Sequence, residues 1–286
     1  MPDTRYWEGG GTDTNDIADA TNWSGNTLPG ASDTAIIAER PAAETGAFTA
    51  SATLPATGTL AAFRVGPSII ADFGTSAPAA LTVNATVMDL SGQGVYQRFA
   101  GTQVTVNVND MNMSADALHL TGTVTTLRVL GGAGTVNVAA SATATNVELL
   151  DAARAKIIVG TSVTNSNITM STGDIETSSN IATKADVLGG MLTVKGTATC
   201  AALDNHVTGL TTYDSSGTLT TLIVYGGKVD FSSSTASSIT VTTATLFEGA
   251  TIDERSGLNN VVWTNGITMR GGVVLTDIAR TLTVSA

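Results

Sequence analysis

An eleven-residue segment that occurs twice constrains the fold of this chain more than any other feature. Residues 122–132 read GTVTTLRVLGG and residues 217–227 read GTLTTLIVYGG, with eight of eleven positions identical. Their offset of 95 residues divides into five steps of 19, and glycine pairs also follow short apolar runs at 189–190 and 271–272. A short strand closed by a glycine turn and repeated every ~20–25 residues is typical of a β-solenoid.

The rest of the chain agrees with stacked short strands. Segments such as 103–108, 135–138, 191–194 and 238–241 alternate apolar residues with Thr, Asn or Lys, the pattern of half-buried strands. Aromatic residues make up only 5% of the chain, so the core must consist of small and β-branched side chains in narrow layers. We therefore expect an all-β chain, a single-stranded right-handed parallel β-helix over residues 35–286.

Two alternatives are weaker. An antiparallel two-sheet sandwich would need regular hairpin turns, and only Asn265-Gly266 has the Asn-Gly pattern of one. Residues 110–118 and 149–156 could each form a turn or two of helix, but strands flank both closely, so we expect solenoid corners there.

Residues 1–34 differ from the body and form a separate predicted segment. They contain Trp7, Trp23 and Pro29 among glycines and asparagines, and two of the three tryptophans of the chain. One interpretation is a cap that covers the open end of the solenoid, because an uncapped end exposes core and unpaired strand edges. The other is an attachment segment, with Trp7, Trp23 and Pro29 as contact residues, because large aromatics carry much of the energy of interfaces.

Charge and composition exclude several partners. The net charge is −11 with only 13 basic residues spread along the chain, so we expect no nucleic-acid binding. No apolar run approaches the ~20 residues of a membrane helix, so we expect no membrane partner. The opening residues lack the profile of a signal peptide, which predicts synthesis in the cytoplasm. The single cysteine, Cys200, has apolar neighbours and is expected to be a buried structural thiol.

The carboxylates give no clear catalytic pattern. The densest acidic run, residues 252–255, is expected to be a solvated loop between strands. Asp174 and Glu176 would share one face of a strand, and Asp186, about one coil further on, could line the same surface. Carboxylates in an acidic chain fall together often, so we predict no catalytic residues and no enzymatic activity.

The histidines give no metal pattern either. His119 and His206 are 87 residues apart, and we expect His119 to point outward between two inward leucines. We expect neither histidine to have a His, Cys or carboxylate at ligand spacing, and therefore predict no metal site and no cofactor.

The segment 6–37 resembles the amino-terminal segment of parallel β-helix proteins of phages and bacterial surfaces. The shared pattern is Trp-x-Gly-Gly, then Asn-Trp-Ser, a proline, and Asp-Thr before an apolar strand. The body, with its Gly-Gly turns and Thr-rich strands, looks like phage head-decoration or fibre proteins and autotransporter passengers. The resemblance implies a homotrimer attached by one end to a virion, whereas secreted relatives would carry an export signal.

The expected function follows from this resemblance. It is a non-enzymatic structural protein of a phage particle, located in the virion and bound to the major capsid protein or other virion proteins. A trimeric capsid decoration (cement) protein comes first among these. A tail or head fibre, a surface adhesin and a polysaccharide-degrading tailspike are the alternatives.

Overall fold

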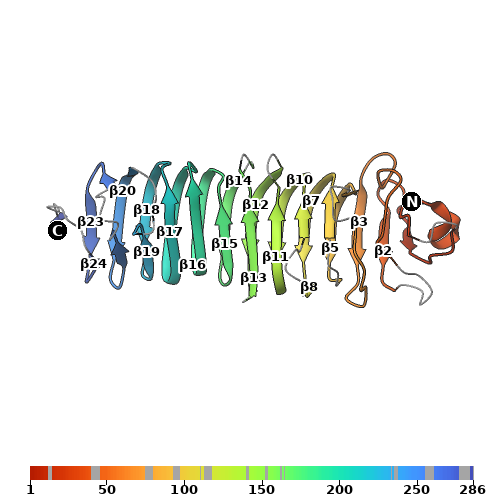
Figure 1. The fold of residues 1–286 in the computed structure, drawn as a ribbon, viewed down its shortest axis with the longest axis horizontal. Coiled ribbons are helices and arrows are strands. Elements are labelled where there is room, and N and C mark those ends of the chain that lie inside the picture. The colour runs from red at the N-terminus through yellow and green to blue at the C-terminus, as the bar shows by residue number, and fades with distance from the viewer. Residues whose placement is uncertain are drawn as a thin grey trace. The chain divides into compact units, whose positions relative to one another are not determined.

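The structure, a computed structural model, describes most of the chain. The described residues are 1–11, 15–39, 46–74, 80–92, 97–109, 111–112, 118–139, 142–151, 154–161, 163, 165–232, 234, 238–254, 261–276 and 284–285. They form two compact units, residues 1–144 and residues 145–286. Both units are built almost entirely from β-strands, and Figure 1 shows the strands of each lying side by side.

Most strands are three to seven residues long, and two are much longer. The first unit contains two 3-10 turns, η1 (Ala20–Asn22) and η2 (Ser24–Asn26), and the strands β1 (Thr4–Tyr6), β2 (Thr34–Ile37), β3 (Leu60–Val65), β4 (Leu81–Thr82), β5 (Ala85–Leu90), β6 (Gln97–Ala100), β7 (Thr102–Val108), β8 (Met111–Asn112), β9 (Leu118–Leu120), β10 (Thr123–Val129) and β11 (Gly132–Val138). The strand β12 (Thr143–Leu149) spans the boundary. The second unit contains β13 (Arg154–Val159), β14 (Asn165–Met170), β15 (Asp174–Thr177), β16 (Ile181–Gly196), β17 (Cys200–Ser215), β18 (Leu219–Val224), β19 (Lys228–Asp230), β20 (Ile239–Phe247), β21 (Thr251–Asp253), β22 (Val261–Trp263), β23 (Ile267–Arg270), β24 (Val274–Thr276) and β25 (Val284–Ser285).

The strands pair in parallel, which confirms the predicted β-solenoid. In the first unit one ladder runs through β1, β2, β3, β5, β7 and β10. In the second unit one ladder runs through β14, β16, β17, β18, β20 and β23. A further ladder there runs through β13, β15, β16, β17, β19, β21 and β24. The long strands β16 and β17 take part in both ladders, because each bends around a corner of the coil.

The repeated segment occupies equivalent positions in the two units. Residues 124–129 of β10 and residues 219–224 of β18 have the same burial at all six positions. The inward residues are Val124, Leu127 and Val129 in the first copy and Leu219, Leu222 and Val224 in the second. Within the second unit the inward column Val147, Ile168, Ala185, Leu203 and Leu222 advances by 21, 17, 18 and 19 residues. One coil at this position is therefore 17 to 21 residues long, close to one fifth of the 95-residue offset.

Glycine pairs close the coils because the backbone of the previous coil leaves no room for a side chain. Gly190 has a φ of 78°, and a Cβ there would lie 2.5 Å from the carbonyl oxygen of Gly173. Gly227, with a φ of 68°, would place its Cβ against the carbonyl oxygen of Gly209. A left-handed turn and a close approach of stacked backbones together require glycine.

The amino-terminal segment is packed onto the first coils. Its strand β1 pairs with β2, so the parallel ladder already begins at Thr4. Trp23 is fully buried and Trp7 is 6% exposed, with their rings edge to face at 5.4 Å. The Trp7 ring also contacts Phe48, with ring centroids 5.2 Å apart, and Phe48 stacks on Phe73 with centroids 4.6 Å apart. These rings form a row in the core.

Of the two segments considered as short helices, residues 110–118 and 149–156, the structure describes the second more fully. Between residues 149 and 156, β12 ends at Leu149 and β13 begins at Arg154, so the expected corner between strands is confirmed at both its ends. Most of residues 110–118 lie outside the described residues, although β8 and the start of β9 are strands. Over the described ranges, no helix is long and apolar enough to cross a membrane.

Candidate functional site

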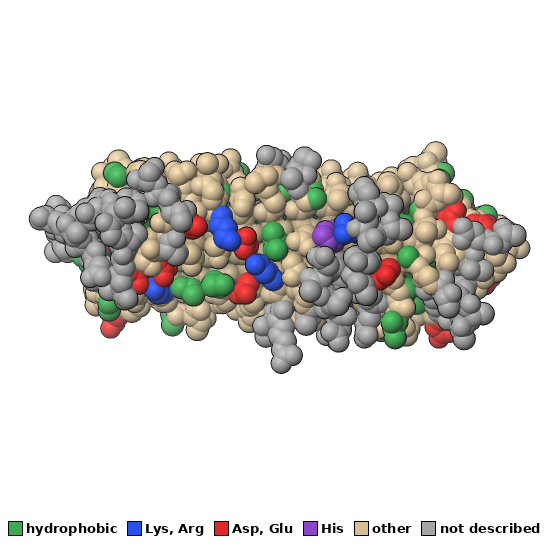
Figure 2. Space-filling view, in the orientation of Figure 1, with side chains coloured by type: hydrophobic (Ala, Val, Ile, Leu, Met, Phe, Trp, Pro, Cys, Tyr) green, Lys and Arg blue, Asp and Glu red, His purple; other side chains and the backbone are tan. Residues whose placement is uncertain are grey.

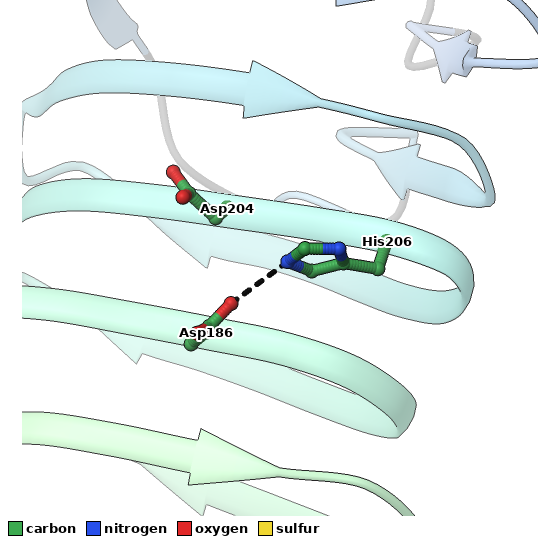
Figure 3. A group of neighbouring side chains, drawn as sticks. All are labelled: Asp186, Asp204 and His206. Atoms are coloured by element: carbon green, nitrogen blue, oxygen red, sulfur yellow. Dashed lines mark hydrogen bonds and ion pairs between the residues drawn. The ribbon is translucent and has the colours of Figure 1, made fainter.

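Three side chains that could act chemically meet on one face of two neighbouring strands of the second unit. Asp186 lies on β16, and Asp204 and His206 lie on β17 (Figure 3). Asp186 and Asp204 are direct partners in the parallel ladder, so their side chains lie on the same side. His206 follows Asp204 by two residues on an extended strand and therefore shares that side.

The polar atoms of this cluster are close together. His206 Nε2 lies 2.9 Å from Asp186 Oδ1. One carboxylate oxygen from each aspartate and one imidazole nitrogen all lie within 4.8 Å of one another. This set of oxygen and nitrogen donors is one that can coordinate a metal ion.

A lysine neutralises part of the negative charge. Lys184 Nζ lies 2.7 Å from Asp204 Oδ2 and 3.6 Å from Asp186 Oδ2. The hydrogen bond to Asp204 is the main cause that raises the pKa of Lys184 above its usual value, against the opposing effect of burial. Two carboxylates directly opposite each other would otherwise repel, so Lys184 keeps the pair together.

The strand that carries Asp204 and His206 is held firmly by Asn205 between them. Asn205 points inward and is fully buried. Its Nδ2 donates to the carbonyl oxygens of Gly209 and Gly226, each at 3.0 Å, and its Oδ1 accepts from the Thr211 hydroxyl at 3.0 Å. These bonds fix the corner of two coils, and with it the direction of the two flanking side chains.

The imidazole of His206 also belongs to a short row of stacked rings. It stacks on Tyr225 of the next coil with ring centroids 5.0 Å apart, and Tyr225 stacks on Phe247 at 5.1 Å. In register, His206 precedes Tyr225 by one coil, and Tyr225 precedes Phe247 by one coil. The row restricts the rotation of the imidazole while leaving Nε2 directed at Asp186.

Two further clusters in the second unit also place one charged group between two groups of opposite charge. The Glu176 carboxylate lies between Lys195 at 2.9 Å and Lys156 at 3.1 Å. Lys228 lies between Asp230 at 2.7 Å and Asp253 at 2.9 Å. On the face drawn in Figure 2, positive side chains likewise lie beside negative ones.

These clusters shift the pKa of their members. The hydrogen bond from Lys195, followed by Lys156, lowers the pKa of Glu176, although burial opposes the shift. Hydrogen bonds to Asp230 and Asp253 raise the pKa of Lys228. Glu176 and Lys228 are therefore held in their charged forms near neutral pH.

The predicted attachment residues are inside the protein. Trp7, Trp23 and Pro29 are all buried, and Trp23 Nε1 donates to the carbonyl oxygen of Ile17 at 2.9 Å. This packing is what the capping interpretation expects. Attachment through this segment stays a prediction, and its direct contacts would have to come from exposed neighbours such as Tyr6, which is 52% exposed.

Two expectations about carboxylates are wrong. Asp174 and Glu176 do not share a surface with Asp186, because β15 pairs with the second half of β16, around the corner from Asp186. The acidic run is not a solvated loop, since Asp253 ends strand β21 and is 3% exposed. Glu254, 8% exposed, accepts a hydrogen bond from Trp263 Nε1 at 2.7 Å. Arg255 lies outside the described residues.

The expectation that neither histidine has a ligand nearby is wrong for His206. The sequence carries only part of the signal, since Asp204 and His206 are two residues apart and would share one face of a strand, whereas the position of Asp186 depends on the register between coils. For His119, the outward position between two buried leucines is confirmed. Cys200 is 1% exposed, as expected, and burial raises the pKa of its thiol to about 12.

The cavity in the second unit lies away from this cluster. It is lined by Thr161, Val163, Asn165, Ser179 and Asn180, among others. Asn165 is 2% exposed, and neither polar atom of its amide has a hydrogen-bond partner. The charged cluster shares no residue with the lining of this cavity, which includes no ionisable group.

Comparisons with known proteins add no relative. No family model matches the chain, and no curated protein and no solved structure matches it either.

Proposed function

We propose that this chain is a non-enzymatic structural protein of a phage particle, and specifically a homotrimeric capsid decoration protein. The observation that carries the proposal is the pairing of charged side chains across neighbouring coils. Lys156, Glu176 and Lys195 form one such group, and Lys228, Asp230 and Asp253 form another. Charges arranged in this way hold a repetitive scaffold together rather than converge on a substrate.

The surface character supports a role in assembly. Outward positions of the strands are filled mainly by Thr, Ser and Asn, and charged residues are only 13% of the chain. Small uncharged side chains on a regular sheet allow close packing of one molecule against another. The same features support the major capsid protein and further copies of this chain as partners, and the acidic balance argues against nucleic acid. The resemblance of residues 6–37 to phage β-helix proteins supports a location in the virion.

The test is the composition and stability of particles. A phage that encodes this chain is compared with a derivative in which the gene is deleted. A decoration protein is present in many copies on the wild-type head, and heads without it release their genome at a lower temperature. A protein present in a few copies at the tail, or a loss of adsorption with unchanged head stability, would instead identify a fibre.

The amino-terminal segment gives a second test. Deleting residues 1–30 removes β1 and both buried tryptophans. If the segment is the attachment region, the truncated protein binds heads at reduced occupancy. Full occupancy of the heads and an intact oligomer would mean that the segment acts only as a cap.

A glycan-cleaving tailspike remains the second candidate, because Asp186 and Asp204 are close enough to resemble a pair of catalytic carboxylates. Lys184 bridges the two carboxylates, which is unfavourable for a pair that must exchange protons with a sugar. Release of reducing sugars from host polysaccharide that is lost in Asp204→Asn would favour the tailspike and reject the decoration role.

A further inference from the structure

We propose that Asp186, Asp204 and His206 bind a divalent transition-metal cation such as Zn²⁺, which displaces Lys184 from between the carboxylates. This inference does not depend on the proposed function. It rests on the donor atoms, their spacing and the rigidity of the strands that carry them.

The donor atoms suit this class of ion. Two carboxylates supply oxygen and an imidazole supplies nitrogen, all of which coordinate zinc at about 2.0–2.2 Å. Calcium and magnesium take oxygen ligands, so the imidazole favours a transition metal over them. Three protein ligands leave a position for water, as in open zinc sites.

The spacing requires little movement. Two ligands of a tetrahedral zinc ion are about 3.3–3.6 Å apart, and His206 Nε2 lies 2.9 Å from Asp186 Oδ1. The three donor atoms lie within 4.8 Å of one another, so the widest pair must approach by at most about 1.5 Å. Rotation of an aspartate side chain closes a gap of that size without a change in the backbone.

The net charge of the cluster favours the binding of a cation. Two carboxylates face a single ammonium group, so the cluster keeps a net negative charge when His206 is neutral. Lys184 is 38% exposed at its side chain and can turn to solvent. The Asp204 side chain is 12% exposed, but the solvated ammonium group of Lys184 limits the strength of the pair, so a multidentate metal ion can replace it.

The support around the ligands favours binding. Asn205 fixes the strand between Asp204 and His206 through bonds to two neighbouring turns. Stacking on Tyr225 restricts the imidazole of His206. Ligands held in this way lose little freedom when a metal binds.

The experiment is calorimetric titration of the untagged full chain with ZnCl₂. The expected result is one saturable site per chain. His206→Gln and Asp186→Asn should each weaken binding at least about tenfold, the loss known even for residues that only support metal ligands. His119→Gln is the matched control, because it removes the other histidine of the chain and should leave the affinity unchanged.

Lys184→Met distinguishes the proposal from loss of folding. Removing the competing ammonium group should tighten zinc binding several-fold, a gain that a damaged fold cannot produce. Circular dichroism of each variant checks that the β-structure is retained, and Co²⁺ in place of zinc should give a visible absorption band that His206→Gln abolishes.

Several results would overturn the proposal. They are the absence of saturable zinc binding, equal binding by wild type and His206→Gln, loss of affinity in His119→Gln, and unchanged or weaker binding in Lys184→Met. Calcium binding as tight as zinc binding would also reject a transition-metal site.

Discussion

Two buried asparagines of the second unit differ in how their amides are used. Asn205 makes three side-chain hydrogen bonds at 3.0 Å, to Gly209, Gly226 and Thr211. Asn165 is equally buried, but its amide atoms have no partner. Burial of a polar group stabilises a protein only when its hydrogen bonds are made, so the same residue type should have opposite effects at the two positions.

Leucine substitutions test this difference. Asn205→Leu leaves two carbonyl oxygens and one hydroxyl without partners and should lower the free energy of unfolding by about 3 kcal/mol. Asn165→Leu removes an unpartnered amide and should raise it by about 1 kcal/mol. Urea unfolding of both variants measures the two changes. A large loss of stability in Asn165→Leu would mean that its amide is satisfied by bound water in the adjoining cavity.

The glycine corners can be tested with a matched pair. Gly227 and Gly249 both have left-handed backbone, with φ of 68° and 82°. A Cβ at Gly249 would meet open space, whereas at Gly227 it would overlap the carbonyl oxygen of Gly209. Gly249→Ala should cost about 1–2 kcal/mol from backbone strain alone, and Gly227→Ala should cost clearly more. Equal losses in chemical denaturation would show that the stacked backbone can yield.

At the scale of the elements, charged side chains connect strands that are neighbours in space and one coil apart in sequence. Glu176 on β15 connects Lys156 on β13 with Lys195 on β16. These groups are partly exposed, so each pair contributes at most about 1 kcal/mol. Their arrangement fixes register as well, because a slip of one residue would move every partner to the opposite face.

The lowered pKa of Glu176 predicts an acid-dependent loss of stability. Its contribution is complete above the ordinary glutamate value of 4.5 and disappears as pH falls through the lower pKa of the folded state. Wild type should therefore exceed Glu176→Gln in stability at neutral pH by less than about 1 kcal/mol, and the difference should vanish in acid. Unfolding of both proteins across this range measures it, and a difference that persists or grows in acid would contradict the assignment. Lys195→Met should reduce the difference at neutral pH.

The ladders also show what could be predicted from the sequence. Period-2 alternation and the repeat at an offset of 95 were enough to predict parallel coils, and the predicted segment 103–108 lies in strand β7. The cluster of Asp186, Asp204 and His206 was missed because it requires exact register between coils. Steps between the inward residues vary from 17 to 21, and β16 changes register twice against β17. Bulges of this kind leave no clear mark in composition or spacing.

At the scale of the whole molecule, both units contain rows of rings in their interiors. The first unit has a row of core rings that includes Trp7, Phe48 and Phe73. In the second unit Phe231 lies between Tyr213 and Trp263, and this unit also contains the aliphatic column and the three charged clusters. Because each coil contacts mainly its neighbours, stability in such a fold is close to a sum over coils.

The proposed trimer makes a direct prediction about mass. Sedimentation equilibrium should give about three times 28.9 kDa for the full chain. The physical reason is that regular faces of small residues leave little strain when three solenoids pack together. A stable species of 28.9 kDa over the whole concentration range would reject the trimer. It would leave the fold and the metal site unaffected.

The stepwise register of the second unit also bears on how such a chain changes over generations. Leu203 and Leu222 are the same inward position one coil apart, 19 residues along the sequence. Loss or duplication of one such segment keeps every other side chain facing the same way, whereas insertion of a single residue inside a strand inverts the faces that follow. Recombination between neighbouring coils can therefore alter the length of the gene in viable increments, and the two copies of the eleven-residue segment are what such copying would leave behind.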